Sequence, residues 1–150
     1  MDGAVSSLGA LDRARALVKP LAAAAGRIEA ARELPPDLLA DMHAARMFRI
    51  LLPKSLGGDE LDLRAFVEVM ETIAMGDAST AWVLGQGSGC ATAAAFLQPE
   101  AARCWFGPAD AVLAWGAGIQ GRAVEVEGGY RVTGTWTFAS GSRHATLLGG

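Results

Sequence analysis

The spacing of apolar residues changes once along the chain, near Gly107-Pro108. Before this point apolar residues recur every three or four positions, as on one face of a helix. After it they alternate with polar residues, as in strands that have one buried face. The change predicts an α+β chain, with an all-helical domain over residues 1–107 and the beginning of a β-domain over residues 108–150.

Prolines, glycines and capping residues divide the first part into five predicted helices. Asp62 is expected to cap the third helix, and Asp77 or Ser79 the fourth. Pro20 is expected to kink the first helix or to open its second part. The predicted helices cover residues 11–32, 36–46, 63–74, 78–97 and 99–106. The third is expected to carry an apolar face made of Leu63, Phe66, Val67, Met70, Ile73 and Ala74.

Alternation of apolar and polar residues predicts four strands in the second part. They cover residues 111–115, 122–127, 130–138 and 146–148. Gly128-Gly129 tolerates the positive φ angles of a tight turn, so the second and third strands are expected to form a hairpin. Its alternate apolar residues are expected to be half-buried: Val124, Val126, Val132, Trp136 and Phe138. Because these strands are too few to close a sheet or barrel, we expect the chain to be part of a longer protein.

Charge and composition argue against several kinds of partner. The chain has 13 Lys and Arg against 16 Asp and Glu, spread along the sequence, so no basic face is expected for nucleic acid. The N-terminus does not resemble a secretory signal, and the most apolar window, residues 81–97, is short for a membrane span. Cys90 and Cys104 lack the spacing of a disulfide framework or a zinc site. A reducing compartment, the cytoplasm, fits these features.

Two glycine-rich segments have structural explanations. Residues 116–121 match G-x-G-x-x-G, but a strand follows them instead of the helix that receives a pyrophosphate in a dinucleotide site. We interpret the segment as a flexible loop whose backbone amides can approach a planar or phosphorylated ligand closely. Gly85, Gly87 and Gly89 interrupt the fourth helix, where close helix packing is favoured over a ligand contact. A core-anchoring role is favoured for Trp82, just before them.

The sequence indicates no metal site and no catalytic nucleophile. His43 and His144 have no Cys, Asp or Glu at ligand spacing. Ser140 lies near His144, but the G-x-S-x-G elbow and an orienting acid are missing, which argues against a hydrolase. The acid pairs Asp59-Glu60 and Glu125/Glu127 are expected to be solvated charge.

Several segments, taken together, resemble the acyl-CoA dehydrogenase superfamily. Residues 129–145 read GYRVTGTWTFASGSRHA, which is similar to a signature of that superfamily. Upstream, residues 32–35, 48–53, 56–60 and 77–82 are similar to its helical N-terminal domain, in the same order and at compatible spacing. Each motif is weak by itself, whereas their ordered combination is specific.

The resemblance implies a flavoprotein oxidoreductase that binds FAD or FMN. In this superfamily the helical domain precedes a middle β-barrel-like domain and a C-terminal four-helix domain, and the flavin binds between the last two. Phe138 would flank the flavin ring, and the hydroxyl of Ser140 would approach its N5 region. The implied cofactor-binding residues are Trp115, Gly116, Phe138, Ala139, Ser140 and Gly141. Trp82 and His144 are candidate substrate contacts, with a structural role favoured for His144.

Departures from the dehydrogenase pattern favour one branch of the superfamily. Phe138-Ala139-Ser140 stands where the dehydrogenases have Trp-Ile-Thr, and Trp115 to Gly118 replaces their Thr-Glu-Pro-like stretch. The Phe-Ala-Ser-Gly-x-x-His-Ala form resembles the two-component flavin-dependent hydroxylases. There, a separate flavin reductase supplies reduced flavin, which reacts with oxygen and a small substrate such as an aromatic compound.

Two alternatives stay open. One is an acyl-CoA dehydrogenase that oxidises an acyl thioester and passes electrons to an electron-transfer flavoprotein. The other is a truncated module that is inactive alone. The resemblance further implies a homotetramer and a catalytic base in the C-terminal domain, so no residue of this chain is expected to be that base.

Overall fold

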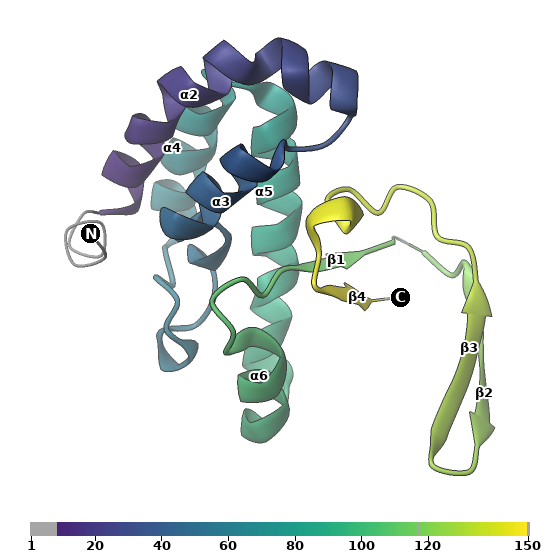
Figure 1. Cartoon of the computed structure of the whole chain (residues 1–150). Coiled ribbons are helices and arrows are strands. Elements are labelled where there is room, and N and C mark those ends of the chain that lie inside the picture. Colours follow the sequence, from purple (N-terminus) through teal and green to yellow (C-terminus); the bar gives the residue numbers. More distant parts are fainter. Residues whose placement is uncertain (1–8, 117, 150) are drawn as a thin grey trace.

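A helical layer is followed by two pairs of strands, which confirms the predicted α+β class (Figure 1). The computed structural model describes residues 9–116 and 118–149. The start of the N-terminal segment (residues 1–8), Ala117 of the glycine motif and Gly150 lie outside the described residues. The helices are α2 (Ala10–Ala31), α3 (Pro36–Ala44), α4 (Leu63–Ala74), α5 (Ala78–Ala91) and α6 (Pro99–Phe106). The strands are β1 (Leu113–Trp115), β2 (Gly121–Val126), β3 (Gly129–Gly134) and β4 (Leu147–Gly149).

Helices α2, α4 and α5 lie side by side, and α3 packs across them (Figure 1). The apolar face predicted for the first helix is buried at Leu17, Leu21 and Ile28. It meets Ile73 of α4 and Leu84 of α5 in one core. α2 runs without interruption through Pro20, so no second helix begins there.

Local capping sets the starts of α4 and α5. The side chain of Asp62 accepts a hydrogen bond from the backbone N–H of Ala65 (2.8 Å), which confirms its predicted role. Of the two candidates for the next helix, Asp77 is the cap, because it accepts from the N–H of Thr80 (2.6 Å). α5 is shorter than predicted, since the chain tightens after Ala91 into the 3-10 helix η3 (Thr92–Phe96).

The predicted apolar face of α4 is only partly buried. Leu63 is 76% exposed and Val67 46% exposed, whereas Val69, Thr72 and Ile73 are buried. The prediction was wrong for Leu63 and Val67, and also for the exposed Ala74, because these side chains lie outside the contacts of α4 with α2 and α5. The apolar stripe of α4 extends beyond that contact.

The strands form a parallel pair and a hairpin. β1 pairs with β4, with Leu113 opposite Leu147, and β2 pairs with β3 in antiparallel register. The hairpin is confirmed, but its turn is shifted by one residue: Glu127 and Gly128 (φ 83°) form it, and Gly129 already pairs with Val126. The hairpin projects away from the helical layer (Figure 1).

The expectation of a half-buried hairpin face was wrong for Val132, which is 59% exposed, and for Phe138, which is 91% exposed, because little of the described chain packs on the hairpin. Trp136 is half-buried, as predicted. β3 also ends at Gly134, so Trp136 and Phe138 lie beyond the strand and do not share a strand face. Glu125 and Glu127 are exposed on the hairpin, as expected for solvated charge.

Packing explains two of the helix glycines. A Cβ at Gly85 would lie 3.2 Å from the Cε atom of Met70 in α4, as expected for close helix packing. A Cβ at Gly87 would lie 3.3 Å from side-chain atoms of Phe48 and Val112, so close packing is confirmed there. At Gly89 a Cβ would meet nothing within 4 Å in the described part of the chain. The core-anchor expectation for Trp82 was wrong, because its side chain lies on the outer face of α5 and is 62% exposed.

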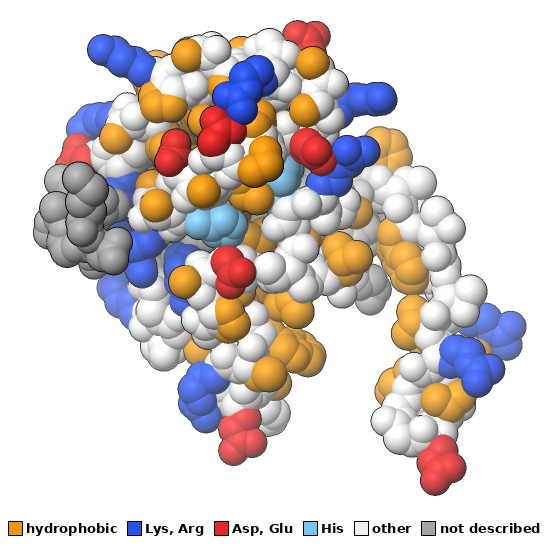
Figure 2. Space-filling model, viewed as in Figure 1, with side chains coloured by type: hydrophobic (Ala, Val, Ile, Leu, Met, Phe, Trp, Pro, Cys, Tyr) orange, Lys and Arg blue, Asp and Glu red, His pale blue; other side chains and the backbone are white. Residues whose placement is uncertain are grey.

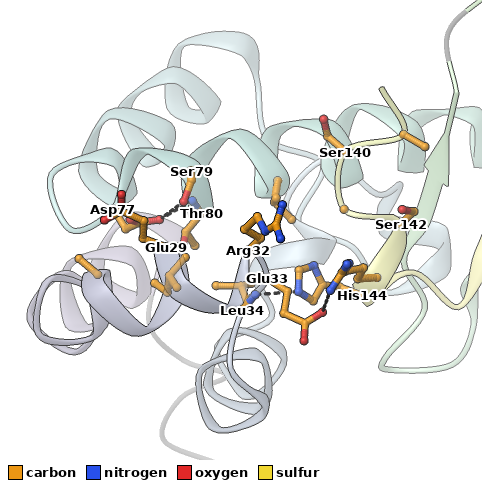
Figure 3. A pocket seen from close by; sticks show the side chains of 16 residues that line it. Glu29, Arg32, Glu33, Leu34, Asp77, Ser79, Thr80, Ser140, Ser142 and His144 are labelled. Carbon is orange, nitrogen blue, oxygen red and sulfur yellow. Dashed lines mark hydrogen bonds and ion pairs between the residues drawn. The ribbon is translucent and has the colours of Figure 1, made fainter. Parts of the chain in front are cut away.

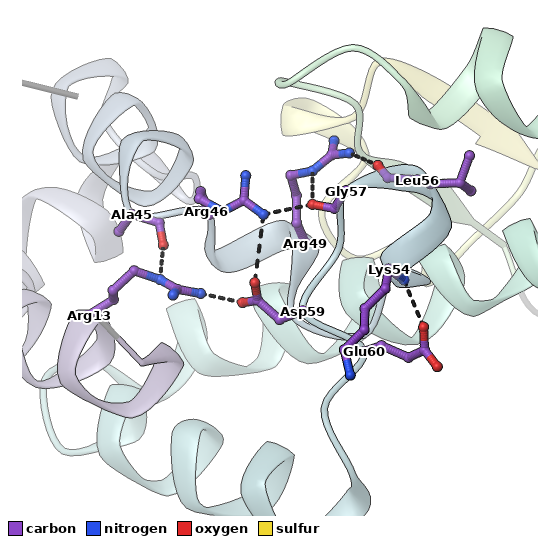
Figure 4. A network of polar contacts seen from close by, with 9 residues as sticks. All are labelled: Arg13, Ala45, Arg46, Arg49, Lys54, Leu56, Gly57, Asp59 and Glu60. Carbon is purple, nitrogen blue, oxygen red and sulfur yellow. Dashed lines mark hydrogen bonds and ion pairs between the residues drawn. The ribbon is translucent and has the colours of Figure 1, made fainter. Parts of the chain in front are cut away.

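Arginines tie the loop between α3 and α4 to both ends of the helical part (Figure 4). Buried Arg13 of α2 donates to the carbonyl of Ala45 (2.8 Å) and forms an ion pair with Asp59. Asp59 is therefore not the solvated charge that we expected. Arg49 donates to the carbonyls of Leu56 (2.5 Å) and Pro108 (2.9 Å), which fixes the segment where helices give way to strands.

Charged side chains of both signs are interspersed over the visible face of the helical layer (Figure 2). This agrees with the near balance of 13 basic and 16 acidic residues. Histidine side chains are also visible on this face (Figure 2).

Candidate functional site

Residues 138–144 form a tightly folded loop between the hairpin and β4. Phe138 has φ 58° and Gly141 has φ 83°, so two left-handed residues flank Ala139 and Ser140. The backbone N–H of Ser140 donates to the carbonyl of Phe138 (2.9 Å), and that of Ser142 to Ala139 (3.0 Å). A left-handed phenylalanine is disfavoured by its Cβ, and strained residues of this kind are enriched at functional sites.

The side chain of Ser140 is held by a residue from the helical layer. The indole Nε1–H of Trp82 in α5 donates to the hydroxyl oxygen of Ser140 at 3.0 Å. The adjacent Gly141 lies close to Val83, where a Cβ would be 3.3 Å from a methyl group. The sequence analysis singled out Trp82 and Ser140 separately, and it missed their contact because they are 58 residues apart.

The other end of the loop is attached to the junction of α2 and α3. The Nε2 atom of His144 accepts a hydrogen bond from the backbone N–H of Leu34 (2.8 Å), and Arg143 pairs with Glu33 (3.0 Å). The Nδ1 atom of His144 is buried and has no partner among the described residues. This geometry supports the structural role that the sequence favoured.

Both imidazoles lie in environments that disfavour their charged form. Burial lowers the pKa of His144; Arg143 and His43 add to this effect, and Glu33 opposes it. Burial also lowers the pKa of His43, against the attraction of Asp110. The ring of His43 packs at a tilt on Phe48, with ring centroids 5.1 Å apart.

A cavity of about 640 Å³, lined by both apolar and charged side chains, lies between the end of α2, the start of α5 and the loop (Figure 3). His144 and Glu33 lie at one end and Asp77 at the other, with Arg32 between them (Figure 3). Burial raises the pKa of Asp77, but hydrogen bonds from Ser79 and Thr80 outweigh it, so the pKa is lowered overall.

Trp115 is the last residue of β1, and Gly116 follows it. Gly116 packs against the side chain of Trp136. A Cβ at Gly116 would be 2.5 Å from the Cβ of Trp136, and one at Gly121 would overlap the same indole. These glycines make room for Trp136. β2 begins at Gly121, so no helix starts at the glycine motif, and this confirms the rejection of a dinucleotide fold.

An apolar cavity of about 630 Å³ lies between α6, β1, β4 and the hairpin. The sequence did not predict it, since it depends on how the strands are placed over α6. Its lining is dominated by Leu97, Trp105, Phe106, Leu113, Trp136 and Leu147.

Within the described residues, no group of His, Cys, Asp or Glu side chains is placed to hold a metal ion. Cys90 and Cys104 are both free thiols. Burial raises the pKa of Cys90, and the backbone N–H of Trp115, which donates toward the sulfur, partly offsets this rise. No helix in the described ranges is long and apolar enough to cross a membrane.

The helical layer, the strand pairs and the loop at Ser140 define the N-terminal part of an acyl-CoA dehydrogenase-type fold. Residues 10–108 match the family described as "Acyl-CoA dehydrogenase, N-terminal domain". The chain belongs to the acyl-CoA dehydrogenase family, as the resemblance implied.

The curated relatives include monooxygenases and a flavin-dependent oxygenase subunit. The chain is 32% identical over 124 residues to indole-3-acetate monooxygenase of Pseudomonas putida, covering 83% of this chain and 32% of the relative. It is 31% identical over 143 residues to the flavin-dependent monooxygenase oxygenase subunit HsaA of Rhodococcus jostii, covering 93% and 37%. The chain thus spans about a third of the length of these relatives.

Solved structures share the fold. The 3-HSA hydroxylase of Rhodococcus sp. RHA1 superposes with a TM-score of 0.86 at 28% identity, covering 96% of this chain and 38% of that one. XiaF from Streptomyces sp., solved with FADH2 and glycerol, gives a TM-score of 0.85 at 28% identity, covering 91% and 35%.

Proposed function

We propose that this chain is the N-terminal part of the oxygenase component of a two-component flavin-dependent monooxygenase. A separate flavin reductase would supply reduced FAD or FMN, and the product would be a hydroxylated small molecule, with an aromatic compound as the expected substrate class. The relatives named as monooxygenases and oxygenase subunits support this proposal. So does the neighbour solved with FADH2.

The residues of the loop fit a flavin. Phe138 is 91% exposed and offers an aromatic face, while Ser140 offers a hydroxyl two residues away. Because the hydroxyl oxygen of Ser140 already accepts from Trp82, its O–H proton remains available for a flavin nitrogen. This hydrogen bond is the observation that carries the proposal.

When bound, the flavin supplies the redox chemistry, and the protein contributes stacking, hydrogen bonds and exclusion of water. We assign the flavin contacts to one set of residues: Trp115, Gly116, Phe138, Ala139, Ser140 and Gly141. Trp82 is assigned as a candidate substrate contact. We assign His144 a structural role, because its Nε2 holds the loop and its Nδ1 is buried.

We place the division between the helical domain (residues 1–107) and the β-domain (from residue 108) at the end of α6, since α6 ends at Phe106 and β1 begins at Leu113. We further propose that the whole protein carries its catalytic base in a C-terminal helical domain. It would assemble as a homotetramer in the cytoplasm.

An acyl-CoA dehydrogenase is the second candidate, because the matching family carries that name. Turnover assays distinguish the monooxygenase from the dehydrogenase. The full-length gene product is supplied with enzymatically reduced flavin and oxygen, and a panel of phenols and indoles is examined for hydroxylated products. In parallel, short-chain and medium-chain acyl-CoA thioesters are offered with an artificial electron acceptor. Hydroxylation without thioester oxidation supports the proposal, and the reverse pattern supports the dehydrogenase.

A further inference from the structure

The indole of Trp82 lies on the outer face of α5 and contacts the loop through one polar atom. Its side chain is 62% exposed, although it is among the largest apolar side chains of the chain. Its Nε1–H donates to the hydroxyl oxygen of Ser140 at 3.0 Å. We infer that Trp82 is a positioning residue that fixes the hydroxyl of Ser140 for its contact with the flavin. This inference rests on the proposed function.

The hydrogen-bonding capacities of the two side chains give the contact a direction. Tryptophan has one N–H and only donates, whereas a serine hydroxyl has one donor and two acceptor positions. Ser140 therefore accepts from Trp82. One O–H donor and one lone pair remain for a partner on the other side of the oxygen.

The backbone on both sides of Ser140 is held in place, so the main motion left to restrict is rotation of the Ser140 side chain. Phe138 (φ 58°) and Gly141 (φ 83°) set the path of the chain on both sides of Ser140. Gly141 packs on Val83, the neighbour of Trp82 in α5. The same turn of α5 thus holds the backbone through Val83 and the hydroxyl through Trp82.

A competing explanation is that the indole only covers apolar surface. Trp82 also borders a shallow apolar groove of about 510 Å³ together with Phe66 and Met70. A covering role would act independently of Ser140. A positioning role would vanish when the hydroxyl is removed, and this difference can be measured.

The test is a double-mutant cycle on reduced-flavin affinity in the full-length gene product. Trp82→Phe removes the N–H and keeps an aromatic ring, and Ser140→Ala removes the hydroxyl. Loss of a hydrogen-bond partner of this kind weakens binding by roughly threefold to tenfold. We expect Trp82→Phe to show this loss in the wild-type background and no further loss in Ser140→Ala. Trp105→Phe is the matched control, since Trp105 is 48% exposed on α6, outside the proposed flavin contacts.

Two results would overturn the inference in distinguishable ways. If wild type binds flavin and Trp82→Phe weakens binding equally in both backgrounds, or not at all, Trp82 does not act through Ser140. If wild type binds no flavin in either redox state, the proposed function fails and the inference falls with it. Trp82→Leu repeats the cycle as a second donor-free variant, and thermal unfolding of each variant shows whether it is folded.

Discussion

His144 accepts a hydrogen bond at Nε2 from the backbone N–H of Leu34, which lies 110 residues earlier in the chain. The contact joins the loop that carries Ser140 to the junction of α2 and α3. Because Nε2 is the acceptor, the neutral ring carries its proton on Nδ1. A second proton can bind only if the contact to Leu34 breaks.

This contact predicts a stability that depends on pH. The pKa of His144 is lowered in the folded state, and unfolding returns it to about 6.5. The unfolded chain therefore binds more protons, so the stabilisation is complete above about pH 6.5 and is lost as pH falls towards the lowered value. Urea unfolding between pH 7.5 and 5 should show this decline, and His144→Gln should reduce it.

His43→Gln is the matched variant, because the sequence has two histidines and both have a lowered pKa. Each single substitution should remove part of the decline, and the double variant should remove most of it. An unchanged pH dependence in the double variant would show that the histidines are not its source.

The ion pair between Arg13 and Asp59 should contribute strongly to stability. Arg13 is 4% exposed, so Asp59→Asn removes a carboxylate from a buried guanidinium. Removing one partner of a buried pair costs about 3 kcal/mol in the free energy of unfolding. Asp37→Asn breaks the exposed pair with Arg27 and should leave the unfolding midpoint unchanged. Equal effects of the two substitutions would contradict the burial argument.

Two glycines of α5 should respond differently to alanine. Gly89→Ala meets open space and should stabilise the protein by about 0.5–1 kcal/mol through helix propensity. At Gly87 the new Cβ would press on Phe48 and Val112, which are both buried, so this gain should be lost. Denaturant unfolding of the two variants measures which one is more stable. If Gly87→Ala is more stable than Gly89→Ala, the prediction is refuted.

The left-handed backbone at Gly141 should matter for flavin affinity. Gly141→Ala adds a Cβ at φ 83° and 3.3 Å from Val83, which should displace Ser140 and weaken flavin binding about tenfold. Gly128→Ala has the same φ of 83° but lies in the hairpin turn with open space around it. It should cost stability and leave flavin affinity intact. Equal affinities of the two variants would argue against a flavin site at this loop.

Local signals were sufficient to predict most elements. The caps at Asp62 and Asp77, the prolines that open α3 and α6, and Gly128 of the hairpin turn each act within a few residues. The burial of a face is different, because it depends on what packs over it. For this reason Leu63 and the hairpin valines were assigned to buried faces but are exposed.

The candidate site was predictable only in part. The resemblance drew attention to Phe138, Ser140 and His144, which are neighbours in the sequence. Their partners, Trp82 and Leu34, come from positions 58 and 110 residues away, and hydrogen bonds over such separations leave no periodic signal. Asp59 was misassigned for the same reason, since its partner Arg13 lies 46 residues away.

Flavin titration of the full-length gene product tests the central claim most directly. Binding of FAD and FMN is followed by fluorescence quenching for the oxidised forms, and by anaerobic titration for the reduced forms. A two-component monooxygenase predicts tighter binding of reduced flavin than of oxidised flavin. Tight, preferential binding of oxidised FAD would contradict that account and favour the dehydrogenase, and no binding of any form would contradict a flavin site altogether.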